Sequence, residues 1–362
     1  MDYVTFKIPF SADGDVANDL LTTARLFRAA AQNVLVLAKH QRELPMGMVG
    51  WSNAFRGAAY EVIPNRRYAD GAVALVMGIY TACKTLDIDF KSVELSDWLM
   101  FQQGVFEKSF TSNIVLKHDY TFHVITVSNE GGKRHIITPT PDAVSRYKDL
   151  LSAVLNNDAK YIGRVVINEH AGSRVNGEVE VIVTLDFYNH VFAEEPGGEK
   201  LVGGVSVSAS GIDLVIIRKN NKIAHRKFAL GDTHATSEVV RGLLNYAHNY
   251  GVGLLLMENP TIYAALRWVK PRGGDTEKLG ALVLKALIIE ELILEARRFG
   301  IKIAYVDPRI TMNNELVRKS LQELTRRHEG DEPVDENAAI AYLMAMRGLK
   351  VLTKSSVTTT TK

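Results

Sequence analysis

Residues 201–217 read LVGGVSVSASGIDLVII, and this stretch decides the fold of the second part of the chain. Two apolar runs, 201–208 and 211–218, are separated only by an Ala-Ser dipeptide, which predicts a β-hairpin with a two-residue loop. A third run, 222–230, follows a Lys-Asn-Asn turn and predicts another antiparallel strand. The chain therefore begins a sheet here with three antiparallel strands in sequence order.

The segments that follow alternate between helical and buried-strand patterns. The short apolar run ending at Glu258 and the run KIAYV read as strands of a sheet that is covered on both faces. Three antiparallel strands followed by helix, strand, helix, strand and helix is the order of an RNase H-like α/β domain. The helices are expected at 236–250, 278–299 and 336–349, the strands at 253–258 and 302–306, and the whole domain at 196–352.

The preceding part of the chain predicts a β-rich domain with a helical insertion. A strand pattern at 3–10 leads into an apolar helical stripe at 16–41, and a second helix is expected at 69–85. Strand and turn signals then dominate 111–188, with one helix at 143–155. We therefore expect a discontinuous β-rich domain at 1–15 and 105–195, a helical insertion at 16–104, a Gly/Pro/Glu-rich boundary near 192–200 and a disordered tail at 353–362.

Composition limits the class of protein. The 362 residues are 46% hydrophobic, which is enough for two or three domains with substantial cores. The formal charge is only +2, so a nucleic-acid surface has to come from local clusters of basic residues. Cys83 is the single cysteine, which excludes an internal disulfide and a cysteine zinc site. With no leader-like start and no apolar run of membrane-spanning length, we expect a cytoplasmic protein with no membrane partner.

Two acids stand where such a domain needs them. Glu258 ends a central strand and Asp335 opens the last helix. Hydrolysis of a phosphodiester by two divalent ions needs carboxylates that hold both ions about 4 Å apart. Hard Mg²⁺ or Mn²⁺ ions prefer oxygen ligands. Asp335 also has a plainer interpretation as a helix cap, whereas burial of Glu258 without a partner would cost several kcal/mol.

Four segments resemble the RuvC motifs of TnpB-type (OrfB family) transposon-associated RNA-guided nucleases and their type V CRISPR relatives. The resemblance covers about residues 200–349, and DENAA is its most specific string, because its first Asp matches the third catalytic acid of the family. It implies an RNA-guided DNA-binding protein, with guide RNA and target DNA as partners and a wedge and recognition lobe preceding a magnesium-dependent nuclease. The segments are GIDLVII (211–217), LLLMENP (254–260), IKIAYVDPR (301–309) and DENAAIAYL (335–343).

The sequence departs from this family in two ways. Residues 311–333 contain no cysteine and follow a helical period, so the zinc ribbon of the family is absent. Counting strands puts Ser206 at the position of the first acid, whereas the GID string points to Asp213. If the Ala-Ser loop holds, Ser206 pairs with Asp213 and the two side chains project from the same face. Two alternatives follow. In one, nuclease activity is weakened or absent; in the other, Asp213 takes the place of the missing first acid as a catalytic residue and metal ligand.

Basic residues outside the acidic site are candidates for nucleic-acid contact. One group lies in the helical insertion, and the other lies in the Arg-Trp-Val-Lys-Pro-Arg segment beyond Glu258, which has the character of a flexible loop on a nucleic-acid backbone. Ordinary solvated surface is the alternative for both. The first group is Arg25, Arg28, Arg66 and Arg67, and the second is Arg267, Lys270 and Arg272.

Two other functions share this order of elements. An actin-like sugar kinase or ATPase would need a second Gly-rich phosphate loop, which the sequence lacks. A guide-free RuvC-like resolvase or nuclease would leave the first 200 residues unexplained.

Overall fold

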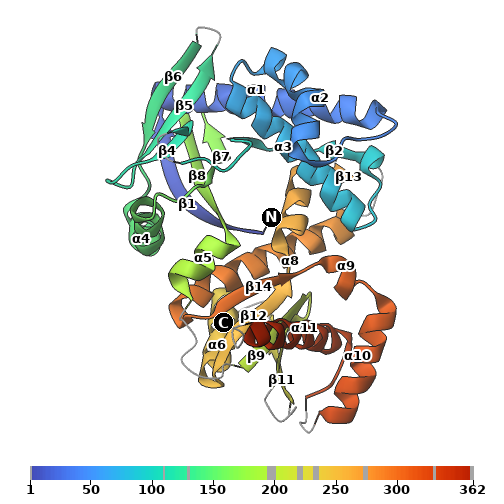
Figure 1. Ribbon diagram of the computed structural model, residues 1–362. Helices are drawn as coiled ribbons and strands as arrows, with labels where there is room; N and C mark the ends of the chain where they lie inside the picture. Colours follow the sequence, from blue (N-terminus) through green and yellow to red (C-terminus); the bar gives the residue numbers. More distant parts are fainter. Residues whose placement is uncertain are drawn as a thin grey trace. The chain divides into compact units, whose positions relative to one another are not determined.

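The computed structural model describes residues 2–108, 111–128, 131–193, 201–217, 223–230, 236–271, 276–328 and 332–358. Apart from the first two residues, the chain divides into two compact units (Figure 1). The N-terminal unit contains residues 3–187 together with 265–274. The C-terminal unit contains residues 188–264 and 275–362.

A four-stranded antiparallel sheet organises the N-terminal unit, in the order β1-β8-β7-β3. Strand β1 pairs with β8 along its whole length, so the first strand of the chain joins strands that follow the helices, as predicted. The edge strand β3 lies inside the segment that was expected to be helical, and that expectation was wrong because four residues are too few to show a periodicity. The bounds are β1 Tyr3–Asp13, β3 Leu99–Gln102, β7 Ile162–Ala171 and β8 Arg174–Thr184.

Three helices pack together in the same unit (Figure 1). The apolar stripe of the first, from Ala17 to Ala38, is buried. Asn65 caps the third by accepting hydrogen bonds from the backbone N–H groups of Arg67 and Tyr68. The three helices are α1 Gly14–His40, α2 Gly47–Val62 and α3 Arg66–Thr85, and α4 Pro141–Asn156 follows later in the chain. The smaller strands are β2 Val93–Leu95, β4 Ile114–Leu116, β5 Phe122–Ser128, β6 Gly131–Ile137 and β13 Val269–Pro271. Strand β13 pairs with β2.

A five-stranded sheet in the order β11-β10-β9-β12-β14 forms the centre of the C-terminal unit. The first three strands are antiparallel, and β12 and β14 run parallel to β9. This is the strand order of an RNase H-like sheet, so the predicted fold class is confirmed. The strands are β9 Leu201–Ser208, β10 Gly211–Ile217, β11 Ile223–Ala229, β12 Val252–Glu258 and β14 Lys302–Val306.

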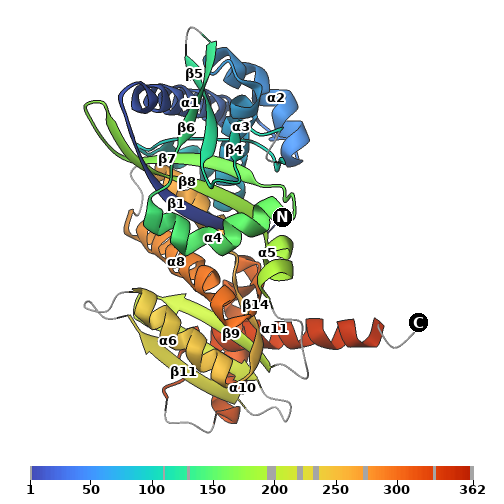
Figure 2. The ribbon, with the colours of Figure 1, turned by 90° about the vertical axis from the view of Figure 1, so that its left-hand side faces the viewer.

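Helices cover both faces of this sheet, with α6 and α11 on opposite sides (Figure 2). Val215 and Ile217 pack against Ala341 and Tyr342 of α11, and Gly204 lies directly under that helix. Helix α11 continues six residues beyond the predicted domain end at 352, because no Gly or Pro stops it, so the expected disordered tail was wrong for 353–358. The helices are α5 Leu185–Phe192, α6 Thr236–Asn249, α7 Pro260–Ala264, α8 Thr276–Ala296, α9 Pro308–Thr311, α10 Asn314–Arg327 and α11 Glu336–Thr358.

Helix α10 fills the segment in which the resembling family has its zinc ribbon, as the helical period predicted. Among the residues that the structure describes, none of the helices has both the length and the apolar character required to cross a bilayer.

Candidate functional site

The acids lie along one level of the C-terminal sheet, on the face that α11 covers. Asp213 pairs in register with Ser206 on one side and with Lys227 on the other. Because Val205 pairs with Met257, Glu258 is the next residue of β12 beside Ser206. Adjacent strands lie about 4.8 Å apart, so Ser206 stands between the two acids, which are roughly 10 Å apart across it. We call Lys227, Asp213, Ser206 and Glu258 the polar row.

Side-chain alternation turns the polar row toward α11. Leu254 and Leu256 pack against Met344 of α11, and Glu258 continues their alternation. Asp213 continues the alternation of Val215, which also packs under α11. The predicted pairing of Ser206 with Asp213 is therefore confirmed, and both side chains face the helix that Asp335 opens.

Glu258 is almost completely buried, with 3% of its surface exposed, and is held by cationic and hydroxyl partners. Its carboxylate forms an ion pair with Lys285 of α8 and accepts a hydrogen bond from the hydroxyl of Thr311 in α9. The ring of Tyr263 packs nearby, and its pKa is raised by burial and then by the negative charge of Glu258. The ammonium nitrogen of Lys285 lies 5.4 Å from the centroid of that ring.

Asp335 caps α11 and also binds a lysine. Its carboxylate accepts a hydrogen bond from the backbone N–H of Ala338 at 2.9 Å and another from Lys227 Nζ at 2.9 Å. Partial burial opposes ionisation, but these two hydrogen bonds hold the pKa of Asp335 below its ordinary value. The hydrogen bond with Asp335 also raises the pKa of Lys227. The capping and site interpretations of Asp335 are therefore compatible.

Asp213 is fully buried and has a histidine partner. His225 Nε2 lies 2.8 Å from Asp213 Oδ1, and the His225 ring meets the ring of His328 edge to face with centroids 5.6 Å apart. The hydroxyl of Ser206 is buried without a hydrogen-bond partner among the described residues. Asp213 thus belongs to the polar row. One oxygen of its carboxylate is bonded to His225 of β11, on the side away from Ser206, and the other, Oδ2, is buried without a hydrogen-bond partner among the described residues.

These residues do not fit the two-ion centre that the fold family implies. The donor at the middle of the row is a neutral hydroxyl, and each acid already has a nitrogen partner from Lys227, Lys285 or His225. Within the described residues, no three His, Cys, Asp or Glu side chains are grouped so that they could hold a metal ion. The donor chemistry is that of charge pairing between side chains and not that of a carboxylate cage.

The predicted basic residues of the helical insertion differ in their environments. Arg25 and Arg66 are exposed and form no ion pair with any residue in the described ranges. Arg28 is bonded to Asp97 at 3.1 Å and to the carbonyl of Ser96. Arg67 forms hydrogen bonds of 2.9 and 3.0 Å with the carboxylate of Glu107. Of these four residues, only Arg25 and Arg66 present guanidinium groups that could bind a phosphate without the loss of an existing hydrogen bond within this unit.

The expectation that Arg267 lies in a flexible loop was wrong. Its guanidinium donates to Glu180 at 2.8 Å, and Arg164 donates to the same fully buried carboxylate at 2.6 Å. The Arg267 guanidinium also lies 4.2 Å from the ring centroid of Trp268. A buried carboxylate in β8 requires such partners, and they hold the segment in place. Lys270 is exposed on β13, and Arg272 lies outside the described residues.

Sequence reasoning did not identify the partners of the acids. Lys227 could have been found, because a hairpin count from Asp213 leads to its position on the third strand. Lys285 carries no such signal, because it lies 27 residues from Glu258 in a helix without a motif. Thr311 lies 53 residues from Glu258, two positions beyond the IKIAYVDPR segment, and a threonine there carries no signal of its own. Glu180 could have drawn attention as an acid within the valine-rich run of β8.

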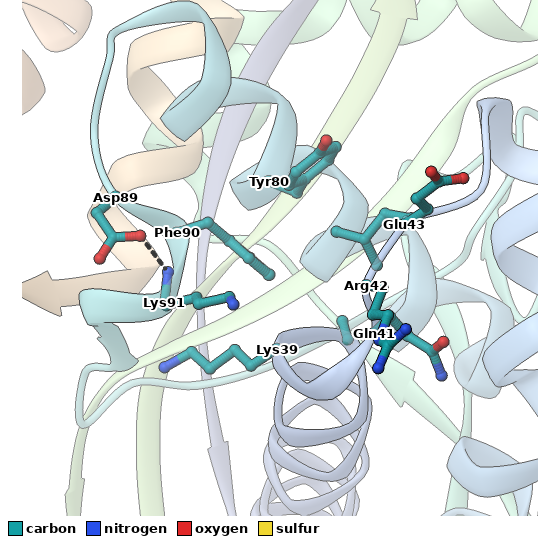
Figure 3. Close-up of a pocket in the computed structure, with 10 residues that line it drawn as sticks. Lys39, Gln41, Arg42, Glu43, Tyr80, Asp89, Phe90 and Lys91 are labelled. Carbon is teal, nitrogen blue, oxygen red and sulfur yellow. Dashed lines mark hydrogen bonds between the residues drawn. The ribbon is translucent and has the colours of Figure 1, made fainter.

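A cavity of about 500 Å³ lies in the N-terminal unit, at the C-terminal end of α1 (Figure 3). Its lining carries both signs of charge beside two aromatic rings. The ammonium of Lys39 is bonded to the carbonyl of Val93, and Asp89 accepts a hydrogen bond from the backbone N–H of Lys91. This mixture selects no ligand class, so we assign the cavity no part in the function.

Comparison with known proteins gives relatives but no activity. No family model matches the chain. Among solved structures, a Cas12f1-sgRNA-target DNA complex is similar at 13% identity and a TM-score of 0.45, covering 91% of this chain and 82% of that chain. A CRISPR-Cas12f ternary complex is similar at 11% identity and a TM-score of 0.32, covering 91% of this chain and 80% of that chain. The T. thermophilus RuvC in complex with a Holliday junction substrate is similar at 13% identity and a TM-score of 0.28, covering 41% of this chain and 91% of that chain.

Two relatives from Aeropyrum pernix are much closer in sequence. Each is described as an uncharacterized protein and is 35% identical over 372 aligned residues, which cover 97% of this chain. The alignment covers 97% of the first relative and 86% of the second. The chain belongs to the family of these two Aeropyrum pernix proteins.

Proposed function

We propose that this protein is an RNA-guided DNA-binding protein that holds its target duplex without cutting it. Guide pairing would select the sequence, while the protein holds the heteroduplex by its backbone. In this proposal the wedge comprises 1–15 and 105–195, the recognition helices comprise 16–104, and the RuvC-like domain comprises 196–352. Guide RNA and target DNA are the partners, and the protein acts in the cytoplasm. The RuvC-type motifs of the C-terminal part support the guided class.

Ser206 is the observation that carries the loss of cleavage. It occupies the centre of the polar row, between Asp213 and Glu258. A carboxylate at this position would reach toward both neighbours and could bridge two ions. A neutral hydroxyl supplies neither the charge nor the second oxygen, so the row lacks the ligand on which a two-ion centre depends.

A second candidate is an active nuclease in which Asp213 replaces the missing acid. The observation in its favour is the register that places Asp213 beside Ser206 and on the same face. In that case Asp213, Glu258 and Asp335 would hold Mg²⁺ or Mn²⁺. The side chains that accompany these acids, Lys227, Lys285 and His225, would first have to be displaced, which favours the protein without cleavage.

The first test is to purify the protein from its host and to sequence any RNA that remains bound. We expect a defined RNA that directs the protein to a matching DNA duplex. Absence of bound RNA, in a preparation that is folded by circular dichroism, would contradict the guided class.

The second test is cleavage of the matched duplex in the presence of Mg²⁺ or Mn²⁺. We expect binding without cleavage. Cleavage that the Asp213→Ala variant abolishes would select the nuclease with the relocated acid. A Glu61→Ala variant, at an exposed position of α2, serves as the control for the loss of one carboxylate.

Arg25 and Arg66 should contribute to RNA affinity. Changing both to alanine removes two exposed guanidinium groups. We expect the slope of log Kd against the logarithm of the salt concentration to decrease by about 2, roughly 1 for each lost phosphate contact. Filter binding of the copurified RNA at several salt concentrations measures this slope. The matched control changes Arg28 and Arg67, which are already paired with Asp97 and Glu107. An equal loss in both variants would contradict the assignment.

A further inference from the structure

The acidic site contains its own positive charges, which come from two different elements. Lys227 belongs to the edge strand β11 and Lys285 to helix α8. Lys227 lies opposite Asp213 in the sheet and is bonded to Asp335, while Lys285 is paired with Glu258. One ammonium group therefore stands on each side of Ser206.

Burial makes these pairs necessary. Asp213 and Glu258 are 0% and 3% exposed, and the half-buried Asp335 approaches the same face from the start of α11. Carboxylates that share a buried site repel one another, and removal of a counter-charge from such a group costs several kcal/mol. The pair of Lys285 with Glu258 is the buried one, with 20% and 4% of the side chains exposed, whereas the pair of Lys227 with Asp335 is partly exposed, at 24% and 40%.

Lys285 is held from two directions. Its ammonium contacts the carboxylate of Glu258 and lies 5.4 Å from the ring centroid of Tyr263, within the range of a cation–π interaction. Thr311 donates to the other oxygen of Glu258, so both oxygens of that carboxylate have partners. A divalent ion could bind Glu258 only by displacing the ammonium of Lys285 from this position.

We propose that Lys227 and Lys285 are built-in counter-ions that take the place of the two divalent ions at the acidic edge of this RNase H-like sheet. The consequence is a domain in which two of the three carboxylates are paired with ammonium groups and the third, Asp213, is bonded to His225, so that the site is folded without metal and excludes Mg²⁺ and Mn²⁺. This inference concerns the charge balance of the C-terminal unit and does not depend on guide RNA.

The test compares Mn²⁺ binding and thermal unfolding of the full chain in EDTA and in MnCl₂. For the wild-type protein we expect an Mn²⁺ affinity too weak to change the Tm, so that the Tm is the same in both buffers. The Lys227→Met/Lys285→Met variant should have a lower Tm in EDTA, because its carboxylates lose their partners. Mn²⁺ should raise that Tm, with an affinity roughly 100-fold or more above that of the wild type, since one adjacent cation at about 4 Å is worth several kcal/mol.

The matched control is Lys302→Met, which removes a lysine from an exposed position of β14. It should leave both the Mn²⁺ response and the Tm as in the wild type. Adding Ser206→Asp to the double variant should increase Mn²⁺ affinity further, because a bridging carboxylate is then present.

Three results would overturn the proposal. Mn²⁺ binding by the wild type as tight as that of the double variant would show that the lysines exclude nothing. A double variant that is stable in EDTA and indifferent to Mn²⁺ would show that they neutralise nothing. A double variant that stays unfolded in both buffers would show that ions cannot take their place. RNA recovered with the same preparations reports separately on guided binding.

Discussion

Replacing Glu180 by glutamine is expected to lower the free energy of unfolding by about 3–5 kcal/mol, because it leaves two buried guanidinium groups without a counter-charge. Glu180 is 0% exposed, and Arg164 and Arg267, its partners, are 12% and 16% exposed. Neither arginine can turn toward water without disturbing its neighbours, because each packs over the ring of Trp268. Urea unfolding followed by tryptophan fluorescence measures the loss.

The control for this prediction is Glu169→Gln, on the exposed part of β7. It removes the same charge from the same sheet, and we expect a change of no more than about 0.5 kcal/mol. A loss below about 1 kcal/mol for Glu180→Gln would contradict the view that this ion network is a main support of the N-terminal unit.

The same carboxylate gives the wild type a distinct dependence on acid. Burial alone would raise the pKa of Glu180, but the charges of Arg267 and Arg164 lower it to about 2. An unfolded glutamate has a pKa of about 4.3. Its contribution to stability is therefore complete above pH 4.3 and is lost as the pH falls toward 2. Between these values the urea midpoint of the wild type should fall toward that of Glu180→Gln, and the two should remain well separated at neutral pH.

Gly204→Ala is the second change with a large expected effect. An added methyl group would lie 1.9 Å from the carbonyl oxygen of Ala341 and 2.7 Å from the backbone nitrogen of Ala345. Both atoms belong to the backbone of α11, so the helix itself has to move away from β9. We expect a loss of about 3 kcal/mol in the free energy of unfolding, at the upper end of the usual cost of overpacking. Thermal or urea unfolding measures it.

Gly242→Ala provides the opposite control within the same unit. Gly242 lies in α6 with open space around the position of an added methyl group, so the change should stabilise the helix by about 0.5–1 kcal/mol. If Gly204→Ala were neutral, the close approach of α11 to the sheet would not be a constraint on the fold. In the expected case, Gly204→Ala should also disturb the acidic site, because a displaced α11 moves its capping residue Asp335.

Local patterns in the sequence were sufficient to predict the C-terminal sheet. The two-residue loop between β9 and β10 determines their register, and so the neighbours Ser206 and Asp213 could be paired from the sequence alone. Strand order followed from the succession of helix and strand patterns. These features depend on neighbours that are close in the sequence or on a fixed period.

The partners of the buried charges could not be predicted in this way. Arg267 meets Glu180 across 87 residues, and Lys285 reaches Glu258 from the middle of a helix with no motif. An arginine beside a tryptophan and a glycine pair has the same local composition whether it contacts a phosphate or a buried carboxylate. Only the tertiary fold separates these cases, and for Arg267 it selects the carboxylate.

The membership of residues 265–274 in the N-terminal unit has a consequence for biosynthesis. This segment supplies β13 for pairing with β2, Arg267 for Glu180 and the Trp268 carbonyl for the indole N–H of Trp98. A ribosome that has translated the chain only as far as residue 187 has therefore not yet made every part of that unit. The N-terminal unit can complete its folding only after residues 265–274 have emerged from the ribosomal exit tunnel. A product truncated before residue 265 should therefore be incompletely folded and sensitive to proteases.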